Sequence, residues 1–251
     1  MKSIRFTSTR LLPQGKKGIL TPDSDGYYEF PVGGLNAFNS AGEYYTLQGA
    51  EDLFKSSSIL MRRINKGVLK SELGHPKKQP GQSEDSYLER ILTIEETNVC
   101  CHIRELRLDY EFGGRNPQFK NPKLVAIMAR IKPSGPHGAS LAASLLNPSE
   151  NVGFSIRGLT NNYYERGQCY RVLTTIVTFD QVNEQGITMA NKWDSPSLES
   201  VSETKVTEKQ LRRIVDSREL VAMESTRELA LDALRKVSVS ELPIIPLYTR
   251  W

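Results

Sequence analysis

Hydrophobic and polar positions along the chain indicate several β-strands. Residues 170–180 are β-branched at most positions, and β-branched side chains favour extended backbone. Residues 124–131 form a continuous apolar run of strand length, which predicts a buried strand. Residues 91–108 read as one or two strands, and residues 1–35 contain a weakly alternating aromatic run that is typical of sheet. The chain is therefore predicted to be rich in β-structure.

Apolar positions also recur with helical spacing. Residues 49–66 carry a rough apolar stripe that ends at Gly67, which predicts a helix with a glycine C-cap. Residues 138–146 are rich in alanine and leucine and predict a short helix. Residues 207–237 predict an amphipathic helix or helix pair. Loops or turns are predicted at residues 77–86, 111–122 and 161–167, and a linker at 183–202.

Composition excludes several classes of protein. The chain has 251 residues, of which 38% are hydrophobic and 25% charged, so it is far from the disordered class. The net charge of +4 is too small and dispersed to predict nucleic-acid binding. No apolar run approaches the length of a membrane span, and the first residues lack a signal-peptide core. The three cysteines lack metal-site spacing, so neither a metal, a cofactor nor a disulfide framework is expected.

A serine between glycines is the first candidate for chemistry. Ser155 follows Gly153 and precedes Arg157 and Gly158. Glycines permit tight turns on either side, and a serine on such a bend presents its hydroxyl in a cleft. Nearby amides, with the charge of Arg157, would then face an oxyanion. The alternative is a structural serine at the end of a strand.

Three histidines are available as a base: His75, His102 and His137. A nucleophilic serine needs an imidazole on a defined backbone, and the proline after His75 biases that residue towards an extended conformation. His102 lies within a predicted strand and is a second candidate, with a structural role as its alternative. His137 lies between proline and glycine and is expected to be exposed.

Two motifs together resemble the prohead (procapsid maturation) proteases of tailed bacteriophages, of the T4-like and giant-phage type, which are distant relatives of the herpesvirus assembly proteases. The first motif, G-x-L-x-x-E-x-x-H-P, is matched by Gly67, Leu69, Glu72, His75 and Pro76. The second, G-x-S-x-R-G, is matched by Gly153, Ser155, Arg157 and Gly158. The resemblance covers roughly residues 20–190.

The resemblance implies a serine endopeptidase with Ser155 as nucleophile and His75 as base. The family's T-[FY]-D-x-V run is similar to the sequence around Asp180, which implies that Asp180 is the third member of the triad. The alternatives are that Asp180 forms a turn and that Glu72 orients the histidine. Because residues 72 and 75 of an extended segment point to opposite faces, Glu72 is expected instead to order the loop or to bind backbone amides. Arg157 and Arg171 are expected to support the oxyanion, with a surface position as the alternative.

The resemblance also implies a fold and an organisation. We expect an α/β (α+β) domain, a mostly antiparallel and partly closed β-barrel surrounded by helices, as in herpesvirus proteases. Residues 1–190 would form the protease domain, 191–205 a linker, and 206–251 a helical C-terminal segment that self-cleavage removes or that remains part of the domain.

The implied substrates are phage head proteins, namely the major capsid protein, scaffold or core proteins and the protease itself, without a requirement for nucleic acid or membrane. Such an enzyme would be made in the host cytoplasm, act inside the prohead, and self-associate. Members from giant phages favour cleavage after Glu in Ser-x-Glu-like sequences. Glu199 and Glu219 lie in such triplets, and Glu199 is favoured because it falls in the predicted linker.

Two other classes of protein remain open at this point. A non-enzymatic phage head or tube protein would keep a related fold but lose the Ser/His pair. A basic scaffold or DNA-associated head protein would carry a stripe of arginine and lysine, which this sequence lacks.

Overall fold

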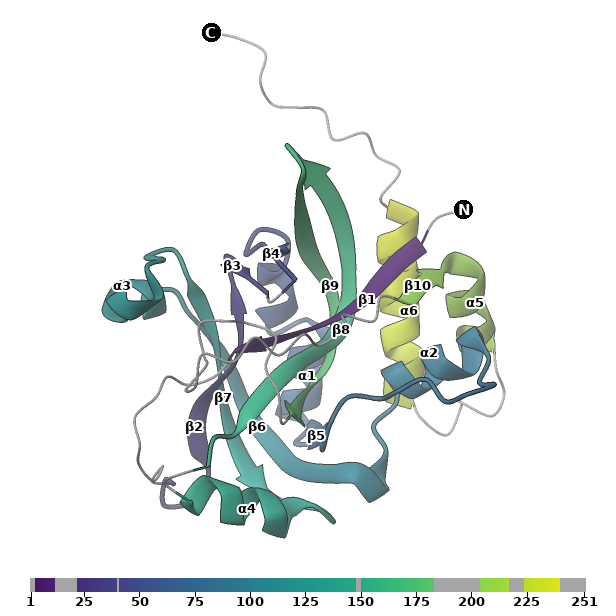
Figure 1. Ribbon diagram of the computed structural model, residues 1–251. Coiled ribbons are helices and arrows are strands. Elements are labelled where there is room, and N and C mark those ends of the chain that lie inside the picture. The colour runs from purple at the N-terminus through teal and green to yellow at the C-terminus, as the bar shows by residue number, and fades with distance from the viewer. Residues whose placement is uncertain are drawn as a thin grey trace, which may run out of the picture.

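Two β-sheets and a set of covering helices form the structure, a computed structural model that describes residues 3–11, 22–39, 41–147, 150–182, 204–216 and 224–239. The six-stranded sheet has the order β10-β1-β8-β9-β4-β3, and the four-stranded sheet has the order β2-β7-β6-β5 (Figure 1). All strand pairs but β4–β9 are antiparallel.

The strands are β1 (Ser3–Leu11), β2 (Tyr28–Leu35), β3 (Ala37–Phe38), β4 (Tyr44–Tyr45), β5 (Lys70–Glu72), β6 (Val99–Asp109), β7 (Val125–Pro133), β8 (Gly153–Glu165), β9 (Gln168–Val182) and β10 (Thr204–Thr207). The α-helices are α1 (Ile59–Asn65), α2 (Glu84–Leu92), α3 (Phe112–Arg115), α4 (Gly138–Leu146), α5 (Glu208–Asp216) and α6 (Glu224–Val239). The 3₁₀ turns are η1 (Glu51–Phe54), η2 (Glu96–Asn98) and η3 (Pro117–Phe119).

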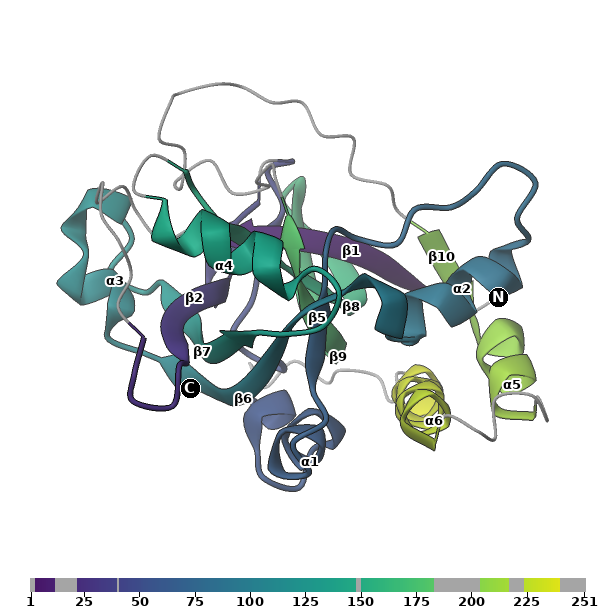
Figure 2. The same cartoon turned by 90° about the horizontal axis from the view of Figure 1, so that it is seen from below.

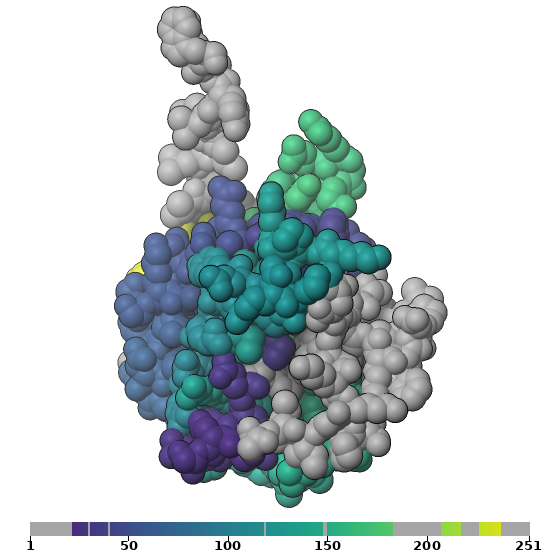
Figure 3. All heavy atoms as spheres, turned by 90° about the vertical axis from the view of Figure 1, so that its left-hand side faces the viewer, coloured from purple at the N-terminus to yellow at the C-terminus, as the bar shows by residue number. Residues whose placement is uncertain are grey.

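The long hairpin of β8 and β9 is the centre of the larger sheet. The strand predicted at 170–180 is confirmed and extends to Gln168–Val182. The turn predicted over 161–167 is wrong for most of its length, because β8 continues to Glu165 and only Arg166 and Gly167 turn, both with positive φ. The tip of this hairpin stands out from the body (Figure 3).

Helix α2 replaces part of a predicted loop and a predicted strand. Ser83 caps it by accepting a hydrogen bond from the amide of Ser86, and Glu84 and Asp85 occupy its first turn, where negative charge suits the helix dipole. One face of the helix is buried. The helix predicted over 49–66 is split into η1 and α1, and the predicted C-cap Gly67 has a φ of 68°.

Two hydrophobic cores lie on the β8–β9 hairpin. The first fills the space between the two sheets and reaches α1 and α4. The second lies between the hairpin and helices α2, α5 and α6, which gather on one side of the molecule in both views (Figures 1 and 2). The amphipathic segment at 207–237 is confirmed as the helix pair α5 and α6, which packs onto the body.

The expectation of a mostly antiparallel α+β fold is confirmed, but the described residues form no closed barrel. Among the described residues, one isolated parallel bridge, between Leu73 and Gln181, links the two sheets, and the other strand pairings lie within each sheet. The similarity to herpesvirus proteases therefore stays a prediction. No helix in the described parts of the chain has the length and apolar character needed to cross a membrane.

Candidate active site

The segment after β5 brings His75 to the end of β9. The amide of Gly74 donates to the carbonyl of Gln181 at 2.6 Å, and the amide of Leu73 donates to the carbonyl of Asn98 at 3.0 Å. Gly74 has a φ of 77°, a conformation that favours glycine. Gly74, which occupies an unspecified position of the first motif, therefore permits the turn that places the imidazole beside Asp180.

His75, Ser155 and Asp180 form a hydrogen-bonded chain. His75 Nε2 lies 2.6 Å from Ser155 Oγ, and Nδ1 lies 2.9 Å from Asp180 Oδ2. A carboxylate only accepts hydrogen bonds, so the Nδ1 proton faces Asp180 and Nε2 is free to accept the serine proton. This arrangement matches a nucleophile, a base and an orienting acid.

The strand register explains why the serine and the aspartate meet. Ser155 lies directly opposite Asp180 in the antiparallel pair of β8 and β9, and opposed residues share a face of the sheet. Ser155 lies inside a strand flanked by β1 and β9, not on the bend that the flanking glycines suggested. Gly158 is required nonetheless, because a Cβ there would lie 2.3 Å from the carbonyl oxygen of Thr175, next to a register shift.

A buried arginine holds the second oxygen of Asp180. Arg157 Nη2 lies 2.8 Å from Asp180 Oδ1 and 2.9 Å from Glu72 Oε1, and all three side chains are fully buried. The backbone amide of Glu72 also donates to Asp180 Oδ1, at 3.2 Å. Asp180 is thus fixed from both sides, with one oxygen left for His75.

Arg157 does not face the position of an oxyanion, contrary to the sequence-based expectation. Its Nη1 donates to the carbonyl of Thr93 at 3.0 Å, while Nη2 is held by the two carboxylates. Burial alone would lower the pKa of Arg157, but the charges of Asp180 and Glu72 raise it. The guanidinium therefore stays charged and supports the aspartate. The surface alternative is also wrong, since Arg157 exposes none of its surface.

Glu72 accepts hydrogen bonds from four groups and does not contact His75. Its donors are Arg90, Arg157, the backbone amide of Glu95 at 2.8 Å and the side chain of Asn98 at 3.1 Å. Burial alone would raise the pKa of Glu72, but the Arg90 hydrogen bonds, Arg157 and the other donors lower it to about 2. The expectation that Glu72 orders the loop and binds a backbone amide agrees with this geometry.

Arg171 is placed away from the triad. Its guanidinium pairs with Glu43, with Nε 2.6 Å from Glu43 Oε2, and lies 3.5 Å from Thr160 Oγ1. Arg171 lies nine positions before Asp180 along β9 (180 − 171), which corresponds to about 30 Å of extended strand. Arg171 is therefore not an oxyanion group, and its full burial also rules out the surface alternative.

Comparisons with known proteins identify the family of this chain. The model of the Peptidase S80 family matches residues 6–235, which is most of the chain. The chain belongs to the Peptidase S80 family. A protein named capsid maturation protease from Pseudomonas phage phiKZ is 40% identical to this S80 peptidase over 197 residues, which cover 77% of this chain and 70% of the relative. A solved structure of the bacteriophage T4 capsid assembly protease aligns with a TM-score of 0.45 and 15% identity, over 72% of this chain and 99% of the other.

The other two histidines of the S80 peptidase lie outside the triad. His102 Nδ1 is 3.0 Å from the hydroxyl of Tyr27, and Nε2 is 3.1 Å from the carbonyl of Gly67. His137 occupies the N-cap position of α4.

Arg90 was not predicted from the sequence as a residue of the site, because its contact with Glu72 depends on helix α2, which was not predicted either. The serine that caps α2 and the acidic residues of its first turn were the sequence signals for this helix.

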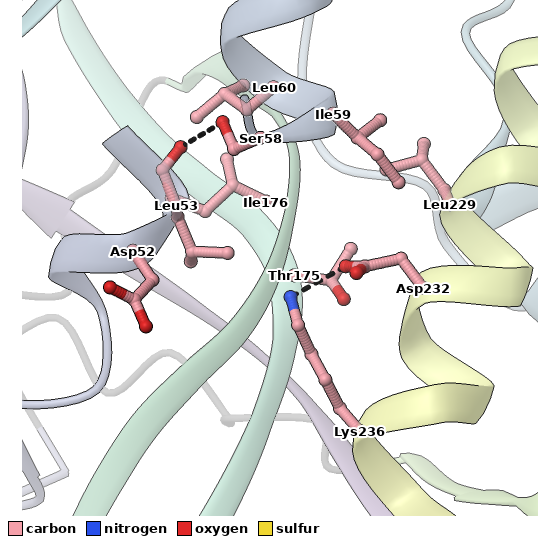
Figure 4. A pocket seen from close by; sticks show the side chains of 10 residues that line it. All are labelled: Asp52, Leu53, Ser58, Ile59, Leu60, Thr175, Ile176, Leu229, Asp232 and Lys236. Atoms are coloured by element: carbon pink, nitrogen blue, oxygen red, sulfur yellow. Dashed lines mark hydrogen bonds and ion pairs between the residues drawn. The ribbon is translucent and has the colours of Figure 1, made fainter. Parts of the chain in front are cut away.

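One pocket of the S80 peptidase lies apart from the triad. It has a volume of about 200 Å³ and lies between η1, α1, β9 and α6 (Figure 4). Its lining includes Thr175, Asp232 and Lys236 but no residue of the triad.

The described residues contain no cluster of three His, Cys, Asp or Glu side chains that would hold a metal ion. Glu199 and Glu219 lie outside the described residues.

Acid is expected to destabilise the S80 peptidase through Glu72. The pKa of Glu72 in the folded protein is about 2, below the ordinary value of 4.5. The ionised carboxylate therefore stabilises the folded state fully above about pH 5, and this stabilisation is lost as the pH falls towards 2. A shift of this size corresponds to roughly 3 kcal/mol. Urea unfolding between pH 2 and 7 should therefore give a free energy of unfolding that falls more steeply with acid in the wild type than in Glu72→Gln. Glu105→Gln, which changes a partly exposed carboxylate of β6, is the control and should show the wild-type dependence of unfolding free energy on pH. The same pH dependence in all three proteins would contradict the assignment of acid destabilisation to Glu72.

Proposed function

We propose that this S80 peptidase is a serine endopeptidase that cleaves phage head proteins during capsid maturation. The hydrogen-bonded chain from Ser155 through His75 to Asp180 carries the proposal. The family supports peptide hydrolysis, and the name of the phiKZ relative supports a role in capsid maturation. Both favour an enzyme over a structural head or tube protein.

The geometry supports an acyl-enzyme mechanism. His75 Nε2 takes the hydroxyl proton of Ser155 as Oγ attacks the scissile carbonyl carbon. Asp180 stabilises the imidazolium that forms, while Arg157 keeps the aspartate in place. Because Arg157 and Arg171 are occupied elsewhere, backbone amides near Ser155 are left to hold the oxyanion. His75 then protonates the leaving amine, and water attacks the acyl-enzyme with His75 again as base.

The full chain holds the nucleophile out of solvent. Ser155 exposes none of its surface and the side chain of His75 exposes 15%. A substrate carbonyl reaches Oγ only after the covering residues shift. This burial supports the proposal that the protein is made in the host cytoplasm as a zymogen of restrained activity, and that a shift of the covering residues, which does not require loss of the C-terminal residues, raises its activity inside the immature head.

Cleavage of a head protein tests the proposed function. Purified wild type and Ser155→Ala would each be incubated with candidate capsid, scaffold and core proteins from the same phage. We expect defined fragments with the wild type only, with new C-termini at Glu in Ser-x-Glu-like sequences. Fragments of equal yield from both proteins would contradict the proposal, and cuts at other residues would contradict the sequence preference alone.

Self-trimming after Glu199 is expected in the wild type and would remove 52 residues (251 − 199). An exposed linker enters an extended-substrate cleft more readily than a folded helix. Glu219 is the less favoured site, because it lies between α5 and α6 in a segment predicted to be helical. Intact-mass measurement on wild type and Ser155→Ala would show a chain ending at Glu199 only in the wild type. A wild type that stays full length while it cuts head proteins would show that residues 206–251 are a permanent part of the enzyme.

A further inference from the structure

Helix α2 contacts the active site at two places. The hydroxyl of Tyr87 donates to the carbonyl of Pro76 at 3.2 Å, directly after His75 in the chain. Arg90 pairs with Glu72, with Nη1 3.1 Å from Oε1. Glu72 in turn binds Arg157 and, through its backbone amide, Asp180. Helix α2 therefore binds the backbone next to His75 through Tyr87. Through Arg90 it also binds Glu72, the carboxylate that shares Arg157 with Asp180.

The position of α2 depends on the C-terminal segment, which we define as β10, α5 and α6 (residues 204–216 and 224–239). The buried face of α2 includes Leu88 and Ile91, both without exposed surface. This face packs in one cluster with α5 and α6, including Leu211 and Ile214. Asp85 also forms an ion pair with Arg213 of α5. A helix of nine residues is marginal in isolation, so packing of this kind fixes where it lies.

The C-terminal segment is joined to the body along two edges. Strand β10 pairs with β1, from Ser3 opposite Thr207 to Phe6 opposite Thr204. On the other side, Lys236 of α6 donates to the carbonyl of Thr174 in β9. The pocket of about 200 Å³ lies along this second edge and is lined in part by residues of α6 (Figure 4). The segment is thus a docked element that contacts α2, β1 and β9.

We propose that Tyr87 and Arg90 are positioning residues for the triad, and that the C-terminal segment keeps the triad in register by holding α2. The proposal rests on the proposed function. It gives the C-terminal segment a role opposite to that of an inhibitory tail, because loosening the segment lowers the rate of catalysis. A cut in the linker leaves an active enzyme for as long as the trimmed piece stays docked.

Two variants in the full-length chain test this proposal, each with a matched control. Ile214→Ala removes a buried side chain next to α2, and Leu124→Ala removes one from a separate cluster near α3. Tyr87→Phe removes the hydroxyl on Pro76, and Tyr27→Phe removes the hydroxyl on His102. The first readout is kcat and KM for a peptide substrate that spans a cleavage site in a head protein. The second is the low-field proton NMR resonance of the His75–Asp180 hydrogen bond. All are taken at a temperature where each protein is folded.

We expect Ile214→Ala and Tyr87→Phe to lower kcat by about 10-fold to 100-fold at nearly constant KM, because small misplacements of reacting groups have effects of that size. Both should also weaken the low-field resonance, while Leu124→Ala and Tyr27→Phe retain wild-type kcat and resonance. Equal effects in a variant and its control, or an unchanged resonance in both α2-linked variants, would overturn the proposal. Failure of the wild type to cleave, or equal cleavage by Ser155→Ala, would instead refute the proposed function, and the resonance would still decide whether the C-terminal segment positions His75.

Discussion

Ser155→Ala and His75→Ala are each expected to reduce proteolysis by about 10⁶-fold, and the double variant is expected to be little worse than either one. The reason is that the serine and the histidine act as a unit, so removal of either abolishes nucleophilic attack. The distance of 2.6 Å between Nε2 and Oγ places them in direct contact. Steady-state cleavage of a head-protein peptide by the four proteins measures the effect.

His102→Ala and Ser71→Ala are the controls for this prediction. His102 is hydrogen-bonded to Tyr27 and Gly67, away from the triad, and Ser71 is a buried serine of β5 next to Cys100. Both variants should keep catalysis if they fold. Near wild-type turnover in Ser155→Ala or His75→Ala would refute the assignment, and equal loss in a folded His102→Ala would move the base to that residue.

Asp180→Asn should lower kcat by about 10⁴-fold, the effect of replacing the orienting acid in a serine protease triad. The asparagine keeps the shape but donates from its amide, so the imidazole adopts the wrong tautomer. Two further contacts depend on the same carboxylate, those with Arg157 and with the backbone amide of Glu72.

Glu72→Gln is the matched comparison, because it also removes one buried carboxylate that Arg157 binds. It should cost less in kcat than Asp180→Asn, since Glu72 does not touch His75. Rates are to be compared at pH 7 for proteins shown to be folded by circular dichroism. If Glu72→Gln were the more damaging of the two, Glu72 would be the orienting group and Asp180 a structural residue.

The two motifs indicated His75 and Ser155 as the proposed base and nucleophile, and the run around Asp180 indicated the proposed acid. Ser155 and Asp180 meet through the register of one hairpin, which is a local effect. His75 reaches them through the contact of the Gly74 amide with the carbonyl of Gln181, which joins distant parts of the chain and does not follow from the sequence pattern. The strand at 170–180 and the helix at 138–146 were predicted because each has a clear pattern of its own.

The roles of the two arginines were not available from the sequence. Arg157 binds Glu72, which is 85 residues away, and Arg171 binds Glu43, which is 128 residues away. Each partner comes from an element whose position is set by packing between distant parts of the chain. The two-residue spacing of Ser155 and Arg157 does place both on one face of a strand, but it does not show which group the guanidinium meets there.

Covalent labelling of the active enzyme tests the central claim most directly. The wild type, while cleaving a head protein, would be treated with a fluorophosphonate, which reacts with activated serines, and the adduct would be located by peptide mass spectrometry. We predict one adduct, on Ser155, which forms in step with the loss of activity and is absent from His75→Ala. Loss of activity with the adduct on another residue, or full activity after complete labelling of Ser155, would contradict the account.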